Sequence, residues 1–313
     1  GGIYQMSNIF NENLSKYAEL VVKVGVNIQK NQFLYITTST DALDLARLIT
    51  KKAYEAGARQ VFVDLADDQI GRARYELAPD DSFDFFPEWK VKERERLKKQ
   101  GAAFVSIVSQ SPDLLKGIDS KRIATFQKAA GTALNKYRQY VQSDKISWTV
   151  IASPSEAWAE KVFPNLPKEK QVDALWDAIF KATRSDLDNP VEAWTKHNDT
   201  LQKKVHYLNA KKYAKLHYTA PGTDLTIELP KGHLWCGAGS VNEKGEEFMA
   251  NMPTEEVFTV PHKDGVNGYV SSTKPLSYGG NIIDNFKITF ENGRITKVEA
   301  EQGEEVLKNL VAT

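Results

Sequence analysis

The sequence predicts an α/β fold: an N-terminal domain with an open, mostly parallel sheet, then an incomplete α+β domain rich in antiparallel strands. Three observations carry this prediction. The length of 313 residues suits two domains of roughly 150 residues each. Up to about residue 160, short apolar runs alternate with helical patterns, as parallel strands joined by crossover helices require. From Leu216 onward, strand patterns follow one another directly, which is typical of antiparallel pairing.

The N-terminal half contains four candidate strands, each a short apolar run of the kind found in sheets covered on both faces. The strands are expected at 33–38, 60–65, 102–108 and 148–151. Helical spacing of apolar residues predicts helices at 11–24, 40–56, 68–77, 88–100 and 120–141. Gly57 follows the second of these helices directly and is a typical C-terminal stop signal.

The second half begins with two further helices and then changes to strands. The helices are expected at 168–184 and 190–212, and the strands at 216–219, 225–229, 233–235, 257–260, 286–290 and 295–299. Asn292-Gly293 joins the last two strands as a hairpin, and a helix opens at Glu304. We therefore expect a cloning scar at 1–5, the α/β domain at 6–165, a helical connection at 166–212 and the first part of the α+β domain at 213–313.

Composition excludes several classes of function. Lys plus Arg equals 41 and Asp plus Glu equals 41, so no net charge attracts nucleic acid or an anionic membrane. No apolar run approaches the ~20 residues that span a bilayer. Because Cys236 is the single cysteine, an internal disulfide framework is excluded. We expect a cytoplasmic protein that binds neither nucleic acid nor membranes.

Common catalytic signatures are missing from the sequence. It contains no Gly-x-x-x-x-Gly-Lys-Ser/Thr phosphate loop, no His-Glu-x-x-His zinc helix and no Gly-x-Ser-x-Gly nucleophile elbow. Gly237-Ala238-Gly239 is too short for a dinucleotide fingerprint and follows an antiparallel pattern. Cys236 could act as a nucleophile, but no base neighbours it in sequence, so a buried structural thiol is favoured.

Isolated polar residues in the second half favour structural interpretations. Asp224 lies in a tight-turn pattern after Pro221-Gly222, where an Asx turn that caps the loop is the favoured interpretation. His233 precedes an apolar Leu-Trp pair and suits a core or edge position. The remaining candidate histidines lie in helical or strand patterns without metal-ligand spacing; they are His197, His206 and His217.

The most informative segment is 251–259, which contains two adjacent glutamates before an apolar strand pattern. Side chains alternate between faces along a strand, so Glu255 and Glu256 are expected to point in opposite directions. One of them can face a site while the other is solvated. A buried carboxylate needs a cation or a donor, which weakly indicates a metal. On spacing alone, two surface glutamates remain the favoured alternative.

Together with other strings, this segment resembles the M29 family of bacterial metallo-aminopeptidases. The similarity runs from about residue 6 to the last residue. The strings that carry it are Pro253-Thr254-Glu255-Glu256-Val257-Phe258-Thr259, Pro221-Gly222-Thr223-Asp224-Leu225-Thr226, Gly232-His233-Leu234-Trp235, and the segments 13–20, 162–167, 175–184 and 303–308.

The resemblance implies a hydrolase that removes N-terminal residues from peptides with a water activated by two divalent cations, Co²⁺ or Zn²⁺. It implies that residues 213–313 start the metal-binding catalytic domain and that the protein forms a homodimer. The first metal-ligating glutamate of the family falls on Glu256.

The family's remaining ligands lie further along the chain than residue 313. They are a second glutamate, two histidines and an aspartate, with a tyrosine nearby. His262-Lys263-Asp264 imitates a ligand pair, but it comes too early and lies in a glycine-containing loop. Since one glutamate cannot hold two cations, we expect this polypeptide to be a fragment without a complete catalytic centre. Robust cleavage of leucine p-nitroanilide by it with Co²⁺ would refute that expectation.

Two other classes of function compete with this one. The chain could be a non-catalytic small-molecule or peptide-binding protein on a Rossmann-like scaffold, with its ligand at the carboxyl ends of the parallel strands. The glycine-rich strand-to-helix turn that would favour this hypothesis is missing. A non-enzymatic dimerisation module is the weaker alternative.

Overall fold

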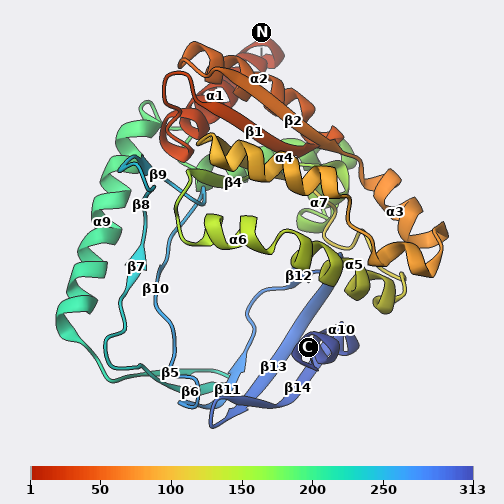
Figure 1. The fold of residues 1–313 in the computed structure, drawn as a ribbon, viewed down its shortest axis with the longest axis vertical. Coiled ribbons are helices and arrows are strands. Elements are labelled where there is room, and N and C mark those ends of the chain that lie inside the picture. The colour runs from red at the N-terminus through yellow and green to blue at the C-terminus, as the bar shows by residue number, and fades with distance from the viewer. Residues whose placement is uncertain (1, 313) are drawn as a thin grey trace. The chain divides into compact units, whose positions relative to one another are not determined.

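The computed structural model describes the backbone of residues 2–312 and the side chains of residues 8–312. It forms two compact units that alternate along the chain (Figure 1). Unit 1 comprises Gly1–Ser111, Lys121–Asp199 and Ala238–Glu255, and unit 2 comprises Pro112–Ser120, Thr200–Gly237 and Glu256–Thr313. The domain boundaries expected from the sequence are contiguous, and they stay a prediction.

Unit 1 is built on a four-stranded sheet. Its strands are β1 (Phe33–Ser39), β2 (Gln60–Ala66), β3 (Ala103–Val108) and β4 (Trp148–Ala152). They pair in the order β2-β1-β3-β4, and every pairing is parallel. The predicted α/β fold is therefore confirmed, and all four strands lie where the apolar runs placed them.

Helices connect these strands and continue beyond them. They are α1 (Gly2–Leu20), α2 (Leu43–Glu55), α3 (Asp68–Leu77), α4 (Glu88–Lys99), α5 (Ser120–Ala133), α6 (Asn135–Gln142), α7 (Glu156–Val162), α8 (Lys168–Ala182) and α9 (Pro190–Lys211). Short turns of other types also occur: a π-helical turn at Val21–Gly25 and 3-10 turns at Thr40–Ala42 and Asp80–Asp84. Gly57 ends the α2 region with φ +101°, as its stop signal predicts.

Two expectations for the helices need correction. The single helix expected over 120–141 is divided between α5 and α6 at Leu134, whose backbone leaves helical geometry (φ −95°, ψ 9°) while its side chain is buried. The short helix α7 was not expected. It starts at a serine cap, because the Ser155 hydroxyl accepts a hydrogen bond from the Trp158 N–H at 3.2 Å.

Both faces of the parallel sheet are covered, as its apolar strands require. One face packs α1, α2 and α8 around a large core that includes Ile36, Val105 and Ile151. The opposite face holds a smaller aromatic cluster in which Tyr35 and Phe104 contact residues of α4 and α6. Alternation along each strand therefore divides the side chains between two cores.

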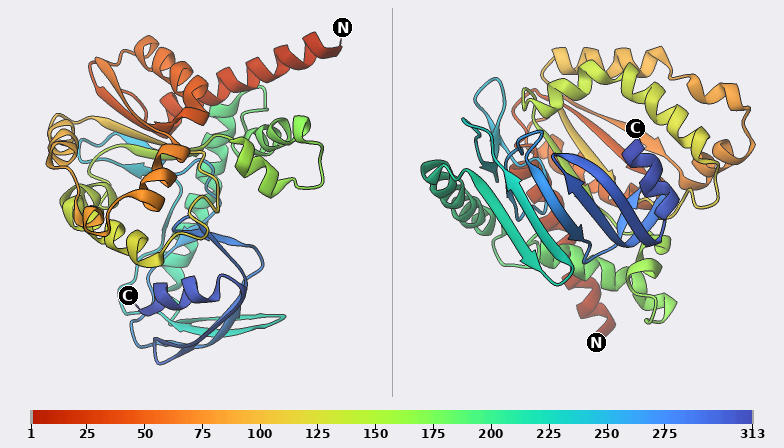
Figure 2. Two further views of the ribbon diagram at one scale, coloured as in Figure 1. Left: turned by 90° about the vertical axis from the view of Figure 1, so that its right-hand side faces the viewer. Right: turned by 90° about the horizontal axis from the view of Figure 1, so that it is seen from below.

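Unit 2 contains an antiparallel sheet, which confirms the second fold prediction (Figure 2). Its strands are β5 (Lys215–Ala220), β6 (Thr223–Glu228), β11 (Val266–Ser271), β12 (Leu276–Tyr278), β13 (Asn281–Glu291) and β14 (Arg294–Gln302). They pair in the order β12-β13-β11-β6-β5, with β14 beside β13. Helix α10 (Glu304–Ala312) follows β14.

The hairpin between β13 and β14 has the turn that Asn-Gly predicts. Asn292 and Gly293 both have positive φ, 49° and 83°, as a type I′ turn requires. The strand expected at 233–235 is wrong, because the N–H and carbonyl of Trp235 bond the side chain of Asn209 on α9 instead of a neighbouring strand. The two-residue strand β7 (Cys236–Gly237) follows it. β7 pairs with β10 (Val257–Phe258).

Another short ladder lies in unit 1. β8 (Ser240–Val241) pairs with β9 (Glu247–Phe248) in antiparallel fashion. None of the helices in the described range 2–312 is long and apolar enough to cross a membrane.

Candidate functional site

The segment that precedes the two glutamates is fixed against the parallel sheet of unit 1. The Val150 N–H donates to the Ala250 carbonyl at 2.9 Å, and the Met252 N–H donates back to the Val150 carbonyl at 3.1 Å. Asn251 thereby forms a parallel bridge with Val150 of β4. The Met252 side chain is fully buried in the large core. The chain that leads to Glu255 is therefore held on the outer edge of β4.

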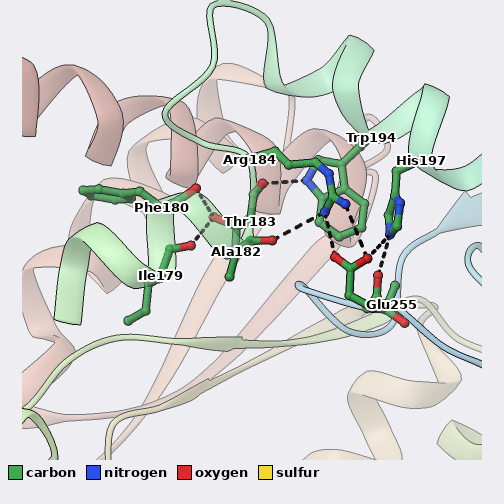
Figure 3. Close-up of polar contacts among 9 residues, drawn as sticks. Ile179, Phe180, Ala182, Thr183, Arg184, Trp194, His197 and Glu255 are labelled. Carbon is green, nitrogen blue, oxygen red and sulfur yellow. Dashed lines mark hydrogen bonds and ion pairs between the residues drawn. The ribbon is translucent and has the colours of Figure 1, made fainter. Parts of the chain in front are cut away.

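Glu255 is held by an arginine and a histidine from two different helical regions (Figure 3). Arg184 Nη1 donates to Oε1 of Glu255 at 3.0 Å, and Nη2 donates to Oε2 at 3.4 Å, so the pair is bidentate. His197 Nε2 lies 3.2 Å from Oε2 of the same carboxylate. The Glu255 side chain is 61% exposed, which limits the stabilisation from this ion pair to about 1 kcal/mol.

Arg184 is positioned by the end of helix α8. Its φ of +61° turns the chain sharply after that helix, and its guanidinium lies over the Trp194 ring at 5.3 Å. Trp194 is buried, and its indole N–H donates to the Thr183 carbonyl at 2.7 Å. The Thr183 hydroxyl donates to the Ile179 carbonyl at 2.8 Å. Arg184 Nη1 also donates to the Ala182 carbonyl at 3.4 Å, so the end of α8 and Trp194 of α9 both contact the guanidinium.

His197 also fixes the backbone of the glutamate segment. Its Nε2 lies 2.6 Å from the Thr254 carbonyl oxygen, which can only accept, so Nε2 carries the proton and donates. The ring packs edge-on against Trp194 at 5.6 Å. The sequence assigned no partner to His197, and no local spacing could have found one, because Thr254 lies 57 residues away.

Glu256 differs from Glu255 in its contacts. Its side chain is exposed, and within residues 8–312 no hydrogen bond or ion pair holds its carboxylate. Strand β10 begins only at Val257, so strand alternation does not govern the two glutamates. Of the pair, Glu255 is the one that is held and Glu256 is the one that faces solvent. The assignment of Glu256 as a metal ligand stays a prediction.

The described residues do not fit a two-metal centre. Among them, no three histidine, cysteine, aspartate or glutamate side chains come close enough together to hold a metal ion. Glu256 could supply one carboxylate ligand of the kind that zinc accepts, but a second cation needs ligands that this group of residues does not provide.

Cys236 overturns an expectation. A buried structural thiol was predicted, but the Cys236 side chain is exposed and unpaired. β7 is a two-residue strand that pairs with β10, and its Gly237 carbonyl also accepts a hydrogen bond from Gln202 Nε2 of α9 at 3.0 Å, but these backbone contacts leave the Cys236 side chain exposed.

Asp224 is placed differently from the prediction as well. It lies inside strand β6, and its Oδ1 lies 2.7 Å from Nε2 of His217 on β5. The turn itself is formed at Gly222, with φ +75°. Both partners are exposed, so this is a cross-strand surface pair rather than an Asx turn.

Two further histidines, His233 and His262, have local partners, whereas His206 is an exposed residue of α9. His233 is half-buried, and its Nδ1 lies 2.9 Å from the Pro230 carbonyl, across the turn at 231–232. His262 Nδ1 accepts a hydrogen bond from the Asp264 N–H at 3.2 Å, which stabilises their loop. The structure therefore gives His262 a structural role within its own turn.

Comparison with known proteins identifies the family. A model of the family described as thermophilic metalloprotease (M29) matches residues 10–313. Aminopeptidase AmpS of Bacillus subtilis (strain 168) is 62% identical over 304 residues, which are 97% of this chain and 74% of that protein. Aminopeptidase 2 of Geobacillus stearothermophilus is 48% identical over 98% of this chain and 74% of its own length.

A solved structure agrees with these relatives. Wild-type AmpT from Thermus thermophilus superposes with a TM-score of 0.90 at 38% identity, covering 97% of this chain and 75% of that chain. Neither a non-catalytic binding protein nor a dimerisation module finds support among these matches. The chain therefore belongs to the M29 family of metallopeptidases, and it is an enzyme of the aminopeptidase type.

Proposed function

We propose that this protein removes N-terminal residues from peptides with the help of two divalent metal ions, Co²⁺ or Zn²⁺, and that Glu256 is one of their ligands. The observation that carries the ligand assignment is the contrast within the Thr254-Glu255-Glu256 string. Glu255 is engaged by Arg184 and His197, whereas the exposed carboxylate of Glu256 has no competing cation among the described residues.

The ion pair of Glu255 supports the proposed ligand role of Glu256, because it restrains the backbone next to Glu256. Arg184 and His197 hold the Glu255 carboxylate, and His197 also holds the Thr254 carbonyl. These bonds fix the backbone directly before Glu256, and the β7–β10 ladder fixes the backbone directly after it. A ligand placed between two such restraints loses little conformational freedom when it binds a cation.

The test compares Glu256→Gln with Glu247→Gln in the protein expressed from its complete gene. Glu247 is an exposed glutamate of β9 and serves as the matched control. Metal affinity is measured by calorimetric titration of the chelator-treated protein with Co²⁺ and Zn²⁺, and hydrolysis of leucine p-nitroanilide is followed in parallel. Glu256→Gln should weaken binding of a metal by at least about tenfold, the scale of losses at metal sites.

The outcomes separate the two parts of the proposal. Unchanged metal affinity in Glu256→Gln would show that Glu256 is not a metal ligand. It would not contradict the proposed peptidase function. Hydrolysis that survives complete removal of metal by a chelator would refute the metal-dependent mechanism itself. Glu247→Gln should match the unsubstituted protein in both measurements.

We also propose that the protein is a cytoplasmic homodimer. Support comes from the family resemblance and from the unpaired thiol of Cys236, the single cysteine, which suits a reducing compartment. Sedimentation at several protein concentrations measures the oligomeric state, and cell fractionation locates the protein. A monomer at micromolar concentration would contradict the first part, and recovery outside the cytoplasm would contradict the second.

A further inference from the structure

Unit 1 contains a cavity that none of the residues around Glu255 and Glu256 line. Its volume is about 360 Å³, which lies within the range of small-molecule sites. Thr37, Ser106 and Val150 of three neighbouring strands line it from the sheet, and Arg94, Tyr137 and Arg138 line it from α4 and α6.

The cavity exists because two successive rows of side chains on this face of the sheet differ in size. In the first row, Phe62, Tyr35, Phe104 and Trp148 are in register across β2, β1, β3 and β4. In the next row on the same face, the register places Asp64, Thr37, Ser106 and Val150 side by side. Large aromatic side chains are thus followed by small ones, which leaves space beneath the α6 region.

The charge around this cavity is positive. Two arginines and no carboxylate are among its lining residues. Arg94 is already paired with Asp64 at 3.4 Å and lies over the Tyr35 ring at 5.4 Å. Arg138 is exposed, and no carboxylate within residues 8–312 pairs with it. Its Nη1 lies 3.4 Å from the place that a Cβ on Gly131 would occupy, so it reaches back from α6 across α5.

Two hydroxyl groups on the sheet side of the cavity can also bond a ligand. Thr37 and Ser106 line the cavity, and their side chains form no hydrogen bond with another described residue. Both are only half-buried. A hydroxyl can donate to a carboxylate, and bonds to an ionised acceptor are shorter and stronger than neutral ones. The cavity therefore offers a free guanidinium, two free hydroxyls and an aromatic wall.

We propose that this cavity binds a small organic acid, whose single carboxylate is held by Arg138 with the hydroxyls of Thr37 and Ser106, and whose apolar body packs against Phe104, Tyr137 and Trp148. This ligand site is separate from the proposed peptidase function, because it shares no residue with the glutamate segment. A free α-amino acid fits less well, since the lining offers no carboxylate to its ammonium group. Inorganic phosphate fits less well because it leaves the aromatic wall without a partner.

The experiment titrates the protein with 3-phenylpropionate by calorimetry at low salt and compares Arg138→Gln with Lys136→Gln. Lys136 is an exposed cation on the same helix, and it does not line the cavity. We expect saturable binding that Arg138→Gln weakens about tenfold, the scale of a lost charge-assisted bond. Lys136→Gln should change the affinity by less than twofold. Peptide hydrolysis should stay unchanged in both variants.

Further ligands and a second variant make the proposal specific. Phenylalanine, 3-phenylpropionamide and inorganic phosphate should each bind at least tenfold more weakly than 3-phenylpropionate. Ser106→Ala, which preserves packing, should weaken 3-phenylpropionate about threefold. No saturation at millimolar 3-phenylpropionate, equal binding of any comparison ligand, or equal losses in Arg138→Gln and Lys136→Gln would overturn the proposal. Circular dichroism of each variant verifies that the fold is retained.

Discussion

The parallel sheet of unit 1 and the antiparallel sheet of unit 2 are stabilised in different ways. β1 is buried along most of its length, whereas no residue of β5 is buried. The parallel sheet lies between two apolar cores. The antiparallel sheet packs against a small apolar cluster around Val205, Leu229 and Trp235. Unit 1 therefore depends mainly on apolar burial, and unit 2 depends more on backbone pairing and on the turns that set its register.

The largest expected effect is on the free energy of unfolding, when the same Ile→Ala substitution is made in each of the two sheets. Ile36 of β1 is fully buried, and Ile227 of β6 is half-buried. Ile36→Ala should lower the free energy of unfolding by about 3–4 kcal/mol, and Ile227→Ala by about 1 kcal/mol. Urea denaturation, with hydrogen exchange to locate each loss, measures both. Equal losses would show that the two sheets do not differ in their dependence on burial.

A glycine pair tests the importance of turns in unit 2. Gly293 and Gly245 have nearly the same φ, 83° and 82°. A Cβ on Gly293 would overlap the Lys263 carbonyl oxygen, whereas a Cβ on Gly245 would meet no atom within 4 Å. Gly245→Ala should cost about 1 kcal/mol from the left-handed backbone alone, and Gly293→Ala about 3 kcal/mol with the added overlap. Thermal unfolding of both variants measures the difference, and similar losses would contradict the steric argument.

The ion pair of the site should contribute less than either core. Arg184→Met removes both hydrogen bonds to Glu255 and should lower the free energy of unfolding by about 1 kcal/mol. A double-mutant cycle with Glu255→Gln isolates the pair, and we expect a coupling energy of about 0.5–1 kcal/mol that falls with added salt. A coupling energy of zero would mean that the Arg184–Glu255 ion pair does not stabilise the fold and that Trp194 and His197 hold the glutamate segment without it.

The smallest effect at neutral pH comes from two tyrosines of unit 1. Burial raises the pKa of Tyr137 to about 12, and a hydrogen bond to Glu243 raises the pKa of Tyr140 to about 12. Because the unfolded value is about 10, the folded state binds these protons more tightly. The contribution of these two tyrosines to stability should be constant below pH 10 and fall as the pH rises from 10 to 12.

Ultraviolet absorbance of tyrosinate, recorded with the unfolding free energy at each pH, checks this window. Tyr137→Phe should remove part of the alkaline loss while keeping the packed ring. An alkaline profile identical to that of the unsubstituted protein would show that Tyr137 does not contribute to it.

Local patterns predicted the fold well. Short apolar runs placed all four strands of unit 1, because a strand covered on both faces has to be apolar along its whole length. Asn292-Gly293 placed the last hairpin, because few other residue pairs accept two positive φ values. Both features are determined by residues adjacent in sequence. The short ladder of β7 was missed, because two-residue strands carry no periodicity.

The site was predicted less completely, because its contacts are distant in sequence. The string around Glu255 and Glu256 was found, but Arg184 lies 71 residues from its partner Glu255. Trp194 lies within the helix expected at 190–212, but helical periodicity does not reveal that its indole N–H bonds the Thr183 carbonyl and that its ring contacts Arg184. Cys236 was placed inside because cysteine is usually buried, whereas its burial depends on what packs over β7.

The segment Ala250–Met252, bonded along β4, affects the order in which the protein can be assembled during synthesis. β4 leaves the ribosome long before its outer neighbour does, and the Thr200–Gly237 part of unit 2 is translated in between. Throughout that interval the nascent chain carries an open strand edge, which can recruit other chains. This edge is closed only after residues 250–252 have been synthesised.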